Sequence, residues 1–352
     1  MNLVSIILLL IILFYLIGRI YYLPTPADEL HFAETDDGWR LALYRYLPGE
    51  AVEGLQPVPG REPVILCHGL SSNHYSLDFD EHNSLARYLR GQGFECWVVD
   101  LRGRGLSLPT SGWRKPWGWR FDDYLQHDLP AIINFVKKKS GADRVHWVGH
   151  SMGGMLMLAY LGSVEQESIK SFCTIGSPAR FNYFWYPVWL RRVSRVILDV
   201  SPVFFDRFFA RLIAPIFLVI NSEKYGYRGR VIPLFFANGV ADVSSNVFKQ
   251  FLDWIETGGF FSADRKTDYQ ENLKNITTPY LSVIGRFDFV ASPRMCRFTF
   301  DRVASPDKEF IVLGKEAGQK QEYEHLSIIL GLNAPKEVFP LIRGFIQHHS
   351  QA

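Results

Sequence analysis

The stretch WVGHSMGG, residues 147–154, places one serine between two glycines in the frame Gly149-x-Ser151-x-Gly153. The residues before it predict a buried strand, and the apolar run MLMLAYLG after it predicts a helix. A serine on such a tight strand-to-helix turn takes a strained backbone conformation, and the glycines allow strand and helix to approach closely. We therefore expect the Ser151 hydroxyl to point into a cleft, beside a helix amino end that favours negative charge.

Similar apolar runs, each ending near a glycine or serine, recur along the chain and alternate with helical stretches. The runs are PVILCHGL (63–70), FECWVVDLRG (94–103), RVHWVGHS (144–151), IKSFCTIGS (169–177), PYLSVIGRFD (279–288) and EFIVLGKE (309–316). Helices are expected between them, at NSLARYLRGQG (83–93) and DLPAIINFVKKKSG (128–141), and at the end over 335–348. The alternation predicts an α/β fold with a mostly parallel central sheet and helices on both faces. Ligands of such sheets bind at the carboxyl ends of the strands.

Residues 181–262 depart from this pattern and hold 20 of the 52 aromatic residues of the chain. Amphipathic helices are expected at WLRRVSRVILDV (189–200), FFDRFFARLIAPIFLVI (204–220) and SNVFKQFLDWIETGG (245–259). We interpret 181–262 as a helical lid inserted into a core made of 24–180 and 263–352. The core is expected to begin with a hairpin turning at Asp36-Asp37-Gly38.

The composition limits the function classes. The 38 Lys and Arg residues nearly balance the 36 Asp and Glu residues, so a net charge of +2 gives no general attraction to nucleic acid. The four cysteines, Cys67, Cys96, Cys173 and Cys296, are too far apart for a redox pair or a zinc cluster, and we expect unpaired core thiols. The sequence suggests no metal, no organic cofactor and no particular oligomeric state.

The amino-terminal run from Leu3 to Leu23 is apolar apart from Ser5, Arg19 and a few tyrosines. As a helix it would extend about 30 Å, so we expect residues 1–23 to form a single transmembrane anchor. A cleaved signal peptide is the alternative, but no basic residue precedes the run and no small-residue cleavage motif follows it. Arg19 at the inner end, together with the unpaired cysteines, favours a globular part on the cytoplasmic side.

A serine nucleophile needs a base, and the base needs a carboxylate to orient it. Asp288 follows the strand of PYLSVIGRFD, and His325 follows the last strand, so both fall where strand ends meet the cleft. The alternative acid position after SFCTIGS holds Ser177, Pro178, Ala179 and Arg180, without a carboxylate. Other histidines lie before the serine or at the frayed tail, and His150 is expected to pack beside the turn. Ser151, His325 and Asp288 are the predicted nucleophile, base and acid.

Acyl transfer also requires donors for the oxyanion that forms on the attacked carbonyl. The backbone N–H of Met152 follows the nucleophile directly. The second predicted donor is the N–H of Leu70, in the loop after PVILC, where Gly69 allows a close approach to the cleft.

These motifs together resemble the α/β-hydrolase superfamily, from about His31 to the carboxyl end. CHGLSSNHYSLDF resembles the oxyanion loop, VVDLRGRGLS the D-x-R-G-x-G-x-S loop, GHSMGG the nucleophile turn, and GRFDFV and EYEHL the acid and histidine loops. The hairpin ETDDGWRLALYRY resembles that of acid lipases, whereas the serine turn and the Arg-Gly-Arg-Gly loop are more similar to monoglyceride lipases and general esterases. Relatives with an aspartate or cysteine nucleophile are excluded by Ser151.

The resemblance implies a carboxylic ester hydrolase that cleaves a hydrophobic acyl or lipid ester through an acyl-enzyme on Ser151, without a cofactor. Peptide or amide hydrolysis and acyl transfer by the same three residues remain alternatives, and a non-enzymatic binding protein is disfavoured because none of the three residues is missing. Two interpretations are open for the aromatic rings in and before the helical lid, and two for its arginines. Its rings either wall an acyl pocket or form its own core, and its five arginines from Arg191 to Arg211 lie either on a membrane surface or in solvent.

The rings are Trp113, Trp117 and Trp119, which precede the lid, and Phe181, Tyr183, Phe184, Trp185, Tyr186 and Trp189 at its start; the arginines are Arg191, Arg192, Arg195, Arg207 and Arg211. Asp122, Asp123 and Asp128 are expected to cap a helix start or to lie on the surface.

Overall fold

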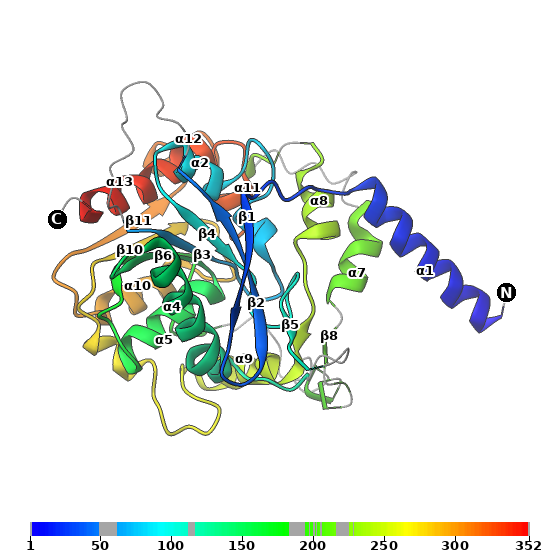
Figure 1. The fold of residues 1–352 in the computed structure, drawn as a ribbon, viewed down its shortest axis with the longest axis horizontal. Coiled ribbons are helices and arrows are strands. Elements are labelled where there is room, and N and C mark those ends of the chain that lie inside the picture. Colours follow the sequence, from blue (N-terminus) through cyan, green and yellow to red (C-terminus); the bar gives the residue numbers. More distant parts are fainter. Residues whose placement is uncertain are drawn as a thin grey trace.

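A nine-stranded sheet forms the centre of the molecule and fixes where the site lies (Figure 1). The computed structural model describes residues 2–48, 62–111, 117–182, 194–196, 198–199, 201, 203–204, 206–215, 225–227 and 229–350. The strand order is β1-β2-β4-β3-β6-β7-β10-β11, with β5 paired to β2. Every pair from β4 to β11 is parallel, and β2 runs antiparallel to β1, β4 and β5. The expected mostly parallel sheet is confirmed.

The bounds of the elements follow the predicted runs closely. The strands are β1 Glu29–Glu34, β2 Trp39–Tyr46, β3 Val64–Cys67, β4 Cys96–Val99, β5 Leu108–Pro109, β6 Val145–His150, β7 Ile169–Ile175, β8 Val203–Phe204, β9 Val243–Ser244, β10 Tyr280–Gly285 and β11 Lys308–Leu313. The α-helices are α1 Leu3–Ile20, α2 Leu85–Gly91, α3 Phe121–Asp123, α4 Leu129–Ser140, α5 Met152–Ser163, α7 Asp206–Ile213, α8 Val231–Asn238, α9 Ser245–Thr257, α10 Pro293–Arg302, α11 Ser327–Leu330, α12 Ala334–Glu337 and α13 Phe339–Ser350. Shorter turns are η1 His74–Ser76, η2 Tyr124–Asp128, η5 Glu271–Asn275 and η6 Lys315–Ala317.

The two faces of the sheet carry separate hydrophobic cores. Alternation along β3 sends Ile65 and Cys67 into a core shared with α4 and α5, and Val64 and Leu66 into a core shared with α2 and α13. Figure 1 shows α4, α5 and α10 on one side of the sheet and α2 and α13 on the other. All four cysteines are buried as free thiols, as predicted.

Close backbone approach determines the turn between β6 and α5. A Cβ on Gly149 would lie 2.3 Å from the carbonyl carbon of Gly153, and a Cβ on Gly153 would lie 2.4 Å from the carbonyl oxygen of Cys67 on β3. Only glycine fits at either position without moving the backbone. The turn therefore holds β6, α5 and the end of β3 together at the carboxyl edge of the sheet.

The segment predicted to be a lid, residues 181–262, is described in part and is called the lid below. Helix α7 covers half of the second predicted lid helix, and α9 matches the third. A short antiparallel pairing of Val203–Phe204 with Val243–Ser244 adds a strand pair that the sequence did not predict. Most of the first predicted helix lies outside the described residues, as do Trp113, Tyr183, Phe184, Trp185, Tyr186, Trp189, Arg191 and Arg192.

The amino-terminal helix α1 projects from the body of the protein beside α7 (Figure 1). Val4, Leu8, Tyr15 and Leu16 are each more than half exposed. Near its end, Ile17 packs with Ala214 and Ala237 of the lid region. None of the helices in the described part of the chain combines the length and the apolar character that a membrane span requires, so the predicted transmembrane helix is not confirmed.

Candidate active site

Ser151 occupies the turn between β6 and α5 with φ 52° and ψ −118°, a region that residues other than glycine rarely adopt. Its backbone N–H donates to the carbonyl of Ile175 at the end of β7, 2.8 Å away. This hydrogen bond ties the strained residue to the neighbouring strand. The side chain is thereby fixed at the carboxyl edge of the sheet.

The structure brings Ser151, His325 and Asp288 together in one chain of hydrogen bonds. His325 Nε2 lies 3.0 Å from Ser151 Oγ, and His325 Nδ1 lies 2.7 Å from Asp288 Oδ2. Asp288 follows β10 by three residues, whereas His325 follows β11 by twelve and lies just before α11. The order and spacing match what activation of a serine hydroxyl requires.

The carboxylate of Asp288 is buried and held by its own loop. Its Oδ1 accepts hydrogen bonds from the backbone N–H groups of Val290, at 2.9 Å, and Ala291, at 2.6 Å. The other oxygen, Oδ2, is thus left for His325. Because one oxygen is fixed by two amides, the carboxylate cannot rotate away from the imidazole without losing both bonds.

The protonation of His325 reflects two opposing effects. Burial favours the neutral imidazole and lowers its pKa, but the charge of Asp288 and its hydrogen bond favour the imidazolium and outweigh burial. The net result is a pKa above the ordinary value of histidine. Asp288 therefore makes His325 a stronger base than burial alone would allow.

The two residues predicted to supply the oxyanion donors lie beside Ser151. Met152 is the first residue of α5, directly after Ser151. Leu70 lines the same cavity as Ser151, and a Cβ on the preceding Gly69 would lie 3.0 Å from the Cβ of Ser151. The loop after β3 therefore packs directly against Ser151.

A cavity of about 430 Å³ contains Ser151 and His325 and continues between the core and the lid. Its lid side is mainly apolar, with Phe209 and Ile213 from α7, Phe235 and Phe236 from α8 and Phe248 from α9. Ligand sites of this size and polarity take an apolar ligand portion and orient it by a few polar groups.

Of the rings singled out from the sequence, the three that the structure describes, Trp117, Trp119 and Phe181, do not line this cavity. Trp119 is buried and donates from Nε1 to the hydroxyl of Tyr124, 2.7 Å away, and Phe181 stacks on Trp254 within the core. Among the described residues, the interpretation of these rings as core is therefore confirmed. The cavity is walled instead by phenylalanines farther along the lid.

One acidic prediction is wrong. Asp128 is fully buried and pairs with Arg102, whose Nη2 lies 2.7 Å from Asp128 Oδ1. Arg102 also reaches Asp37 in the first hairpin, with Nη1 2.7 Å from Asp37 Oδ2. A buried carboxylate is retained because the guanidinium neutralises it, so Asp128 joins the hairpin to the core rather than facing solvent.

His150 contributes more than the sequence suggests. Its Nε2 lies 2.9 Å from the carbonyl oxygen of His325, its ring packs on that of His325 with centroids 4.8 Å apart, and it lines the cavity. Burial and the nearby His325 lower the pKa of His150 to about 3, so it is neutral. His150 thus positions the loop that carries His325.

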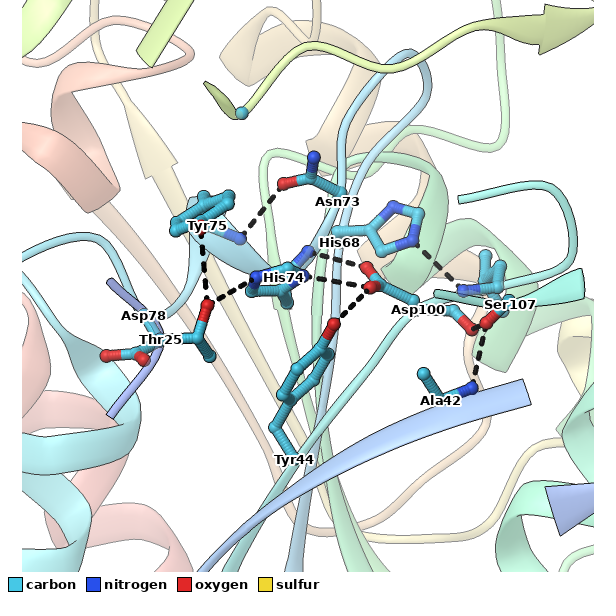
Figure 2. A network of polar contacts seen from close by, with 12 residues as sticks. Thr25, Ala42, Tyr44, His68, Asn73, His74, Tyr75, Asp78, Asp100 and Ser107 are labelled. Carbon is cyan, nitrogen blue, oxygen red and sulfur yellow. Dashed lines mark hydrogen bonds and ion pairs between the residues drawn. The ribbon is translucent and has the colours of Figure 1, made fainter. Parts of the chain in front are cut away.

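A second histidine–aspartate pair anchors the oxyanion loop from the other side (Figure 2). Asp100, after β4, accepts from the backbone N–H of His74 at 2.8 Å and from its side chain, with Oδ2 2.8 Å from Nδ1. The hydroxyl of Tyr44 donates to the same carboxylate at 3.1 Å, and His74 Nε2 lies 3.1 Å from Thr25 Oγ1. Burial raises the pKa of Asp100, but the charge of His74 and its hydrogen bonds outweigh burial, so the pKa of Asp100 lies below its ordinary value.

Two clusters of histidine and acidic side chains lie outside this cavity. Within the described parts of the chain, groups of three His or Asp side chains whose ligand atoms lie within 4.8 Å of one another are Asp307, His348 and His349, and Asp36, Asp37 and His127. Neither cluster shares a residue with the cavity.

Residues 62–315 match the family model described as alpha/beta hydrolase fold, which covers more than two thirds of the chain, and the protein belongs to that family. Lipase member K from Homo sapiens is 32% identical over 91% of this chain and 87% of its own length. Gastric triacylglycerol lipase from Rattus norvegicus is 23% identical over 91% of this chain and 88% of its own length. A monoacylglycerol lipase from Paleococcus ferrophilus shares the fold, with a TM-score of 0.60, 16% identity and coverage of 88% and 99%.

Within this family, the chain is of the lipase and esterase type and is a carboxylic ester hydrolase.

The influence of Asp288 on His325 can be measured directly. Asp288→Asn should lower the pKa of His325 below that in the unaltered protein, because burial remains while the charge that opposes it is lost. Titration of the His325 ring protons by NMR gives the two values. Asp301→Asn, on the exposed face of α10, is the control and should leave the His325 pKa in place. An unchanged value in Asp288→Asn would show that the carboxylate does not set the basicity of His325.

Proposed function

We propose that the protein hydrolyses carboxylic esters of hydrophobic acyl or lipid substrates through an acyl-enzyme on Ser151. The observation that carries the proposal is the hydrogen-bonded chain from Ser151 through His325 to Asp288, opening into an apolar cavity. The named relatives include lipases of triacylglycerols and monoacylglycerols, which supports the same substrate class here.

In the proposed mechanism, His325 Nε2 takes the proton of Ser151 as Oγ attacks the ester carbonyl. The N–H groups of Met152 and Leu70 stabilise the oxyanion, and His325 then protonates the departing alcohol. A water molecule, deprotonated by His325, then attacks the carbonyl of the acyl-enzyme in the same way. This step releases the carboxylic acid and restores the Ser151 hydroxyl. Asp288 stays ionised and stabilises the imidazolium, which is why one of its oxygens must face Nδ1.

The substrate portion that is best defined is the acyl chain. The apolar lid side of the cavity starts at Ser151 and is continuous with Phe235 and Phe236, so the acyl chain would lie along α8. Amide hydrolysis and acyl transfer to an alcohol would use the same three residues. The products distinguish them, because transfer yields a new ester where hydrolysis yields a free acid.

Removal of the nucleophile tests the activity. Ser151→Ala should reduce hydrolysis of p-nitrophenyl butyrate by roughly 10⁶-fold, because the base and oxyanion donors then have no attacking group to assist. A fluorophosphonate probe should label the unaltered chain and not this variant. Ser163→Ala, at the far end of α5, is the matched control and should keep both activity and labelling. Hydrolysis that survives in Ser151→Ala would overturn the assignment.

We further propose that residues 3–23 attach the protein to a membrane as a single anchor, with the globular part on the cytoplasmic side. The exposed apolar side chains of α1 support attachment, since a row of this kind is costly in water. The position of Arg19 at the inner end and the buried free thiols support the orientation.

Charged residues in this apolar row test the attachment. Leu9→Asp together with Leu16→Asp should release the full chain from liposomes in a flotation assay, because carboxylates must then enter the hydrocarbon. Both side chains are 53% exposed, so the folded structure tolerates the change. Val164→Asp, equally exposed but on the body, should leave flotation unchanged. If the double variant floated with the unaltered protein, α1 would not be the anchor.

A further inference from the structure

A second cavity, of about 490 Å³, lies where the end of α1 meets α7 and the loops that follow β3 and β4. It shares no lining residue with the cavity that holds Ser151. Its wall includes Gly18 and Tyr22 from the amino-terminal segment and Arg207 and Arg211 from α7. The cavity therefore joins the proposed anchor to the lid.

The two arginines are four residues apart and so lie on the same face of α7. Arg211 donates from Nε to the carbonyl of Ala237 at 2.9 Å and lies over the ring of Phe14, 4.4 Å from its centroid. A Cβ on Gly18 would lie 2.8 Å from Arg211 Nη1, so glycine at this point makes room for the guanidinium. Neither arginine has a carboxylate within ion-pair distance among the described residues.

The carboxylates in the cavity wall are already engaged. Glu29 is bound by Arg45 Nη1 at 2.9 Å and lies 2.7 Å from His31 Nε2, and Asp242 accepts the backbone N–H of Arg207 at 3.0 Å. Neither of these carboxylates forms an ion pair with the guanidinium group of Arg207 or Arg211 among the described residues, although Asp242 keeps its own negative charge in the wall. Burial, and then the neighbouring Arg207, lower the pKa of Arg211 to about 10, which leaves it protonated at neutral pH.

The floor of the cavity is polar and fixed. Thr25 Oγ1 lies 3.1 Å from His74 Nε2 (Figure 2). Asn73 donates from Nδ2 to the carbonyl of Asn238 at 2.7 Å. Tyr75 donates from its hydroxyl to the carbonyl of Leu23 at 2.7 Å. A cavity that presents two guanidinium groups without ion pairs among the described residues, beside these polar side chains, suits a compact anion that accepts several hydrogen bonds.

The position relative to α1 indicates the source of that anion. The exposed apolar side chains of α1 precede Gly18 and Tyr22, so insertion of α1 into a bilayer would place the cavity at the level of the headgroups. We propose that this cavity binds the phosphate of a phospholipid headgroup through Arg207 and Arg211. The site rests on the membrane attachment proposed above and does not depend on the ester hydrolysis.

The test uses the full chain carrying Ser151→Ala, so that no ester is cleaved, in a neutral detergent. Calorimetric titration with dihexanoyl phosphatidic acid should show saturable binding. Arg207→Gln combined with Arg211→Gln should weaken it by about tenfold or more, because two charge-assisted contacts are lost. Arg144→Gln, an exposed arginine before β6, makes a similar charge change and should alter the affinity by less than about twofold.

Two further arms separate the possible outcomes. Replacement of both arginines by lysine keeps the charge and should retain most of the affinity, which shows that the glutamine pair does not act by unfolding. Inorganic phosphate should bind more weakly than the phospholipid, and dihexanoyl glycerol should show no difference between the glutamine pair and its parent. Unchanged affinity for phosphatidic acid in the glutamine pair would overturn the site. Equal affinity for inorganic phosphate would overturn the lipid source.

Hydrolysis of p-nitrophenyl butyrate by the chain with Ser151 intact is measured separately. If this chain did not hydrolyse the ester, the proposed ester hydrolysis would be contradicted, whereas the phosphate site would be unaffected.

Discussion

The backbone of Ser151 is held at φ 52° between β6 and α5, and the rest of the site is arranged around that turn. A conformation of this kind costs of order 1–3 kcal/mol and persists only where its surroundings fix it. Here β6 lies between β3 and β7, with every residue from Val145 to His150 buried. The contact of Gly153 with the carbonyl of Cys67 then brings the end of β3, and with it the oxyanion loop, against the serine.

The features of this arrangement that depend on residues close together in the chain could be predicted from the amino-acid sequence. The serine turn, the six strand runs and the first hairpin each depend on residue types within a short window. Asp288 and His325 could be placed because loops at the carboxyl edge of a parallel sheet converge, so position along the chain already implies position in the site. Their mutual distances required the folded chain.

The missed features all depend on contacts between distant segments. His74 looks like an ordinary loop histidine until Asp100, 26 residues away, is seen to bind both its backbone and its side chain. Asp128 reads as a helix-start residue, and only its pairing with Arg102 explains why a carboxylate is buried there. In the lid, aromatic residues recur so often that composition could not tell Phe235, at the cavity, from Phe181, in the core.

The segment after α1 also contacts the lid, and the lid in turn contacts the oxyanion loop, although these three regions lie far apart in the chain. Asn238 of α8 donates from Nδ2 to the carbonyl of Tyr21 at 2.6 Å, and the backbone N–H of Ala241 donates to the carbonyl of Ser71 at 3.0 Å. The amino-terminal segment, the lid and the oxyanion loop therefore form one hydrogen-bonded unit beside the serine. In the proposed mechanism, Ser151 carries the acyl group of the substrate during turnover. Rapid acid quenching during turnover of an ester, followed by peptide mass analysis, tests it most directly: the acyl mass should appear on the peptide that contains Ser151, and turnover with the acyl group on another residue, or on none, would contradict the account.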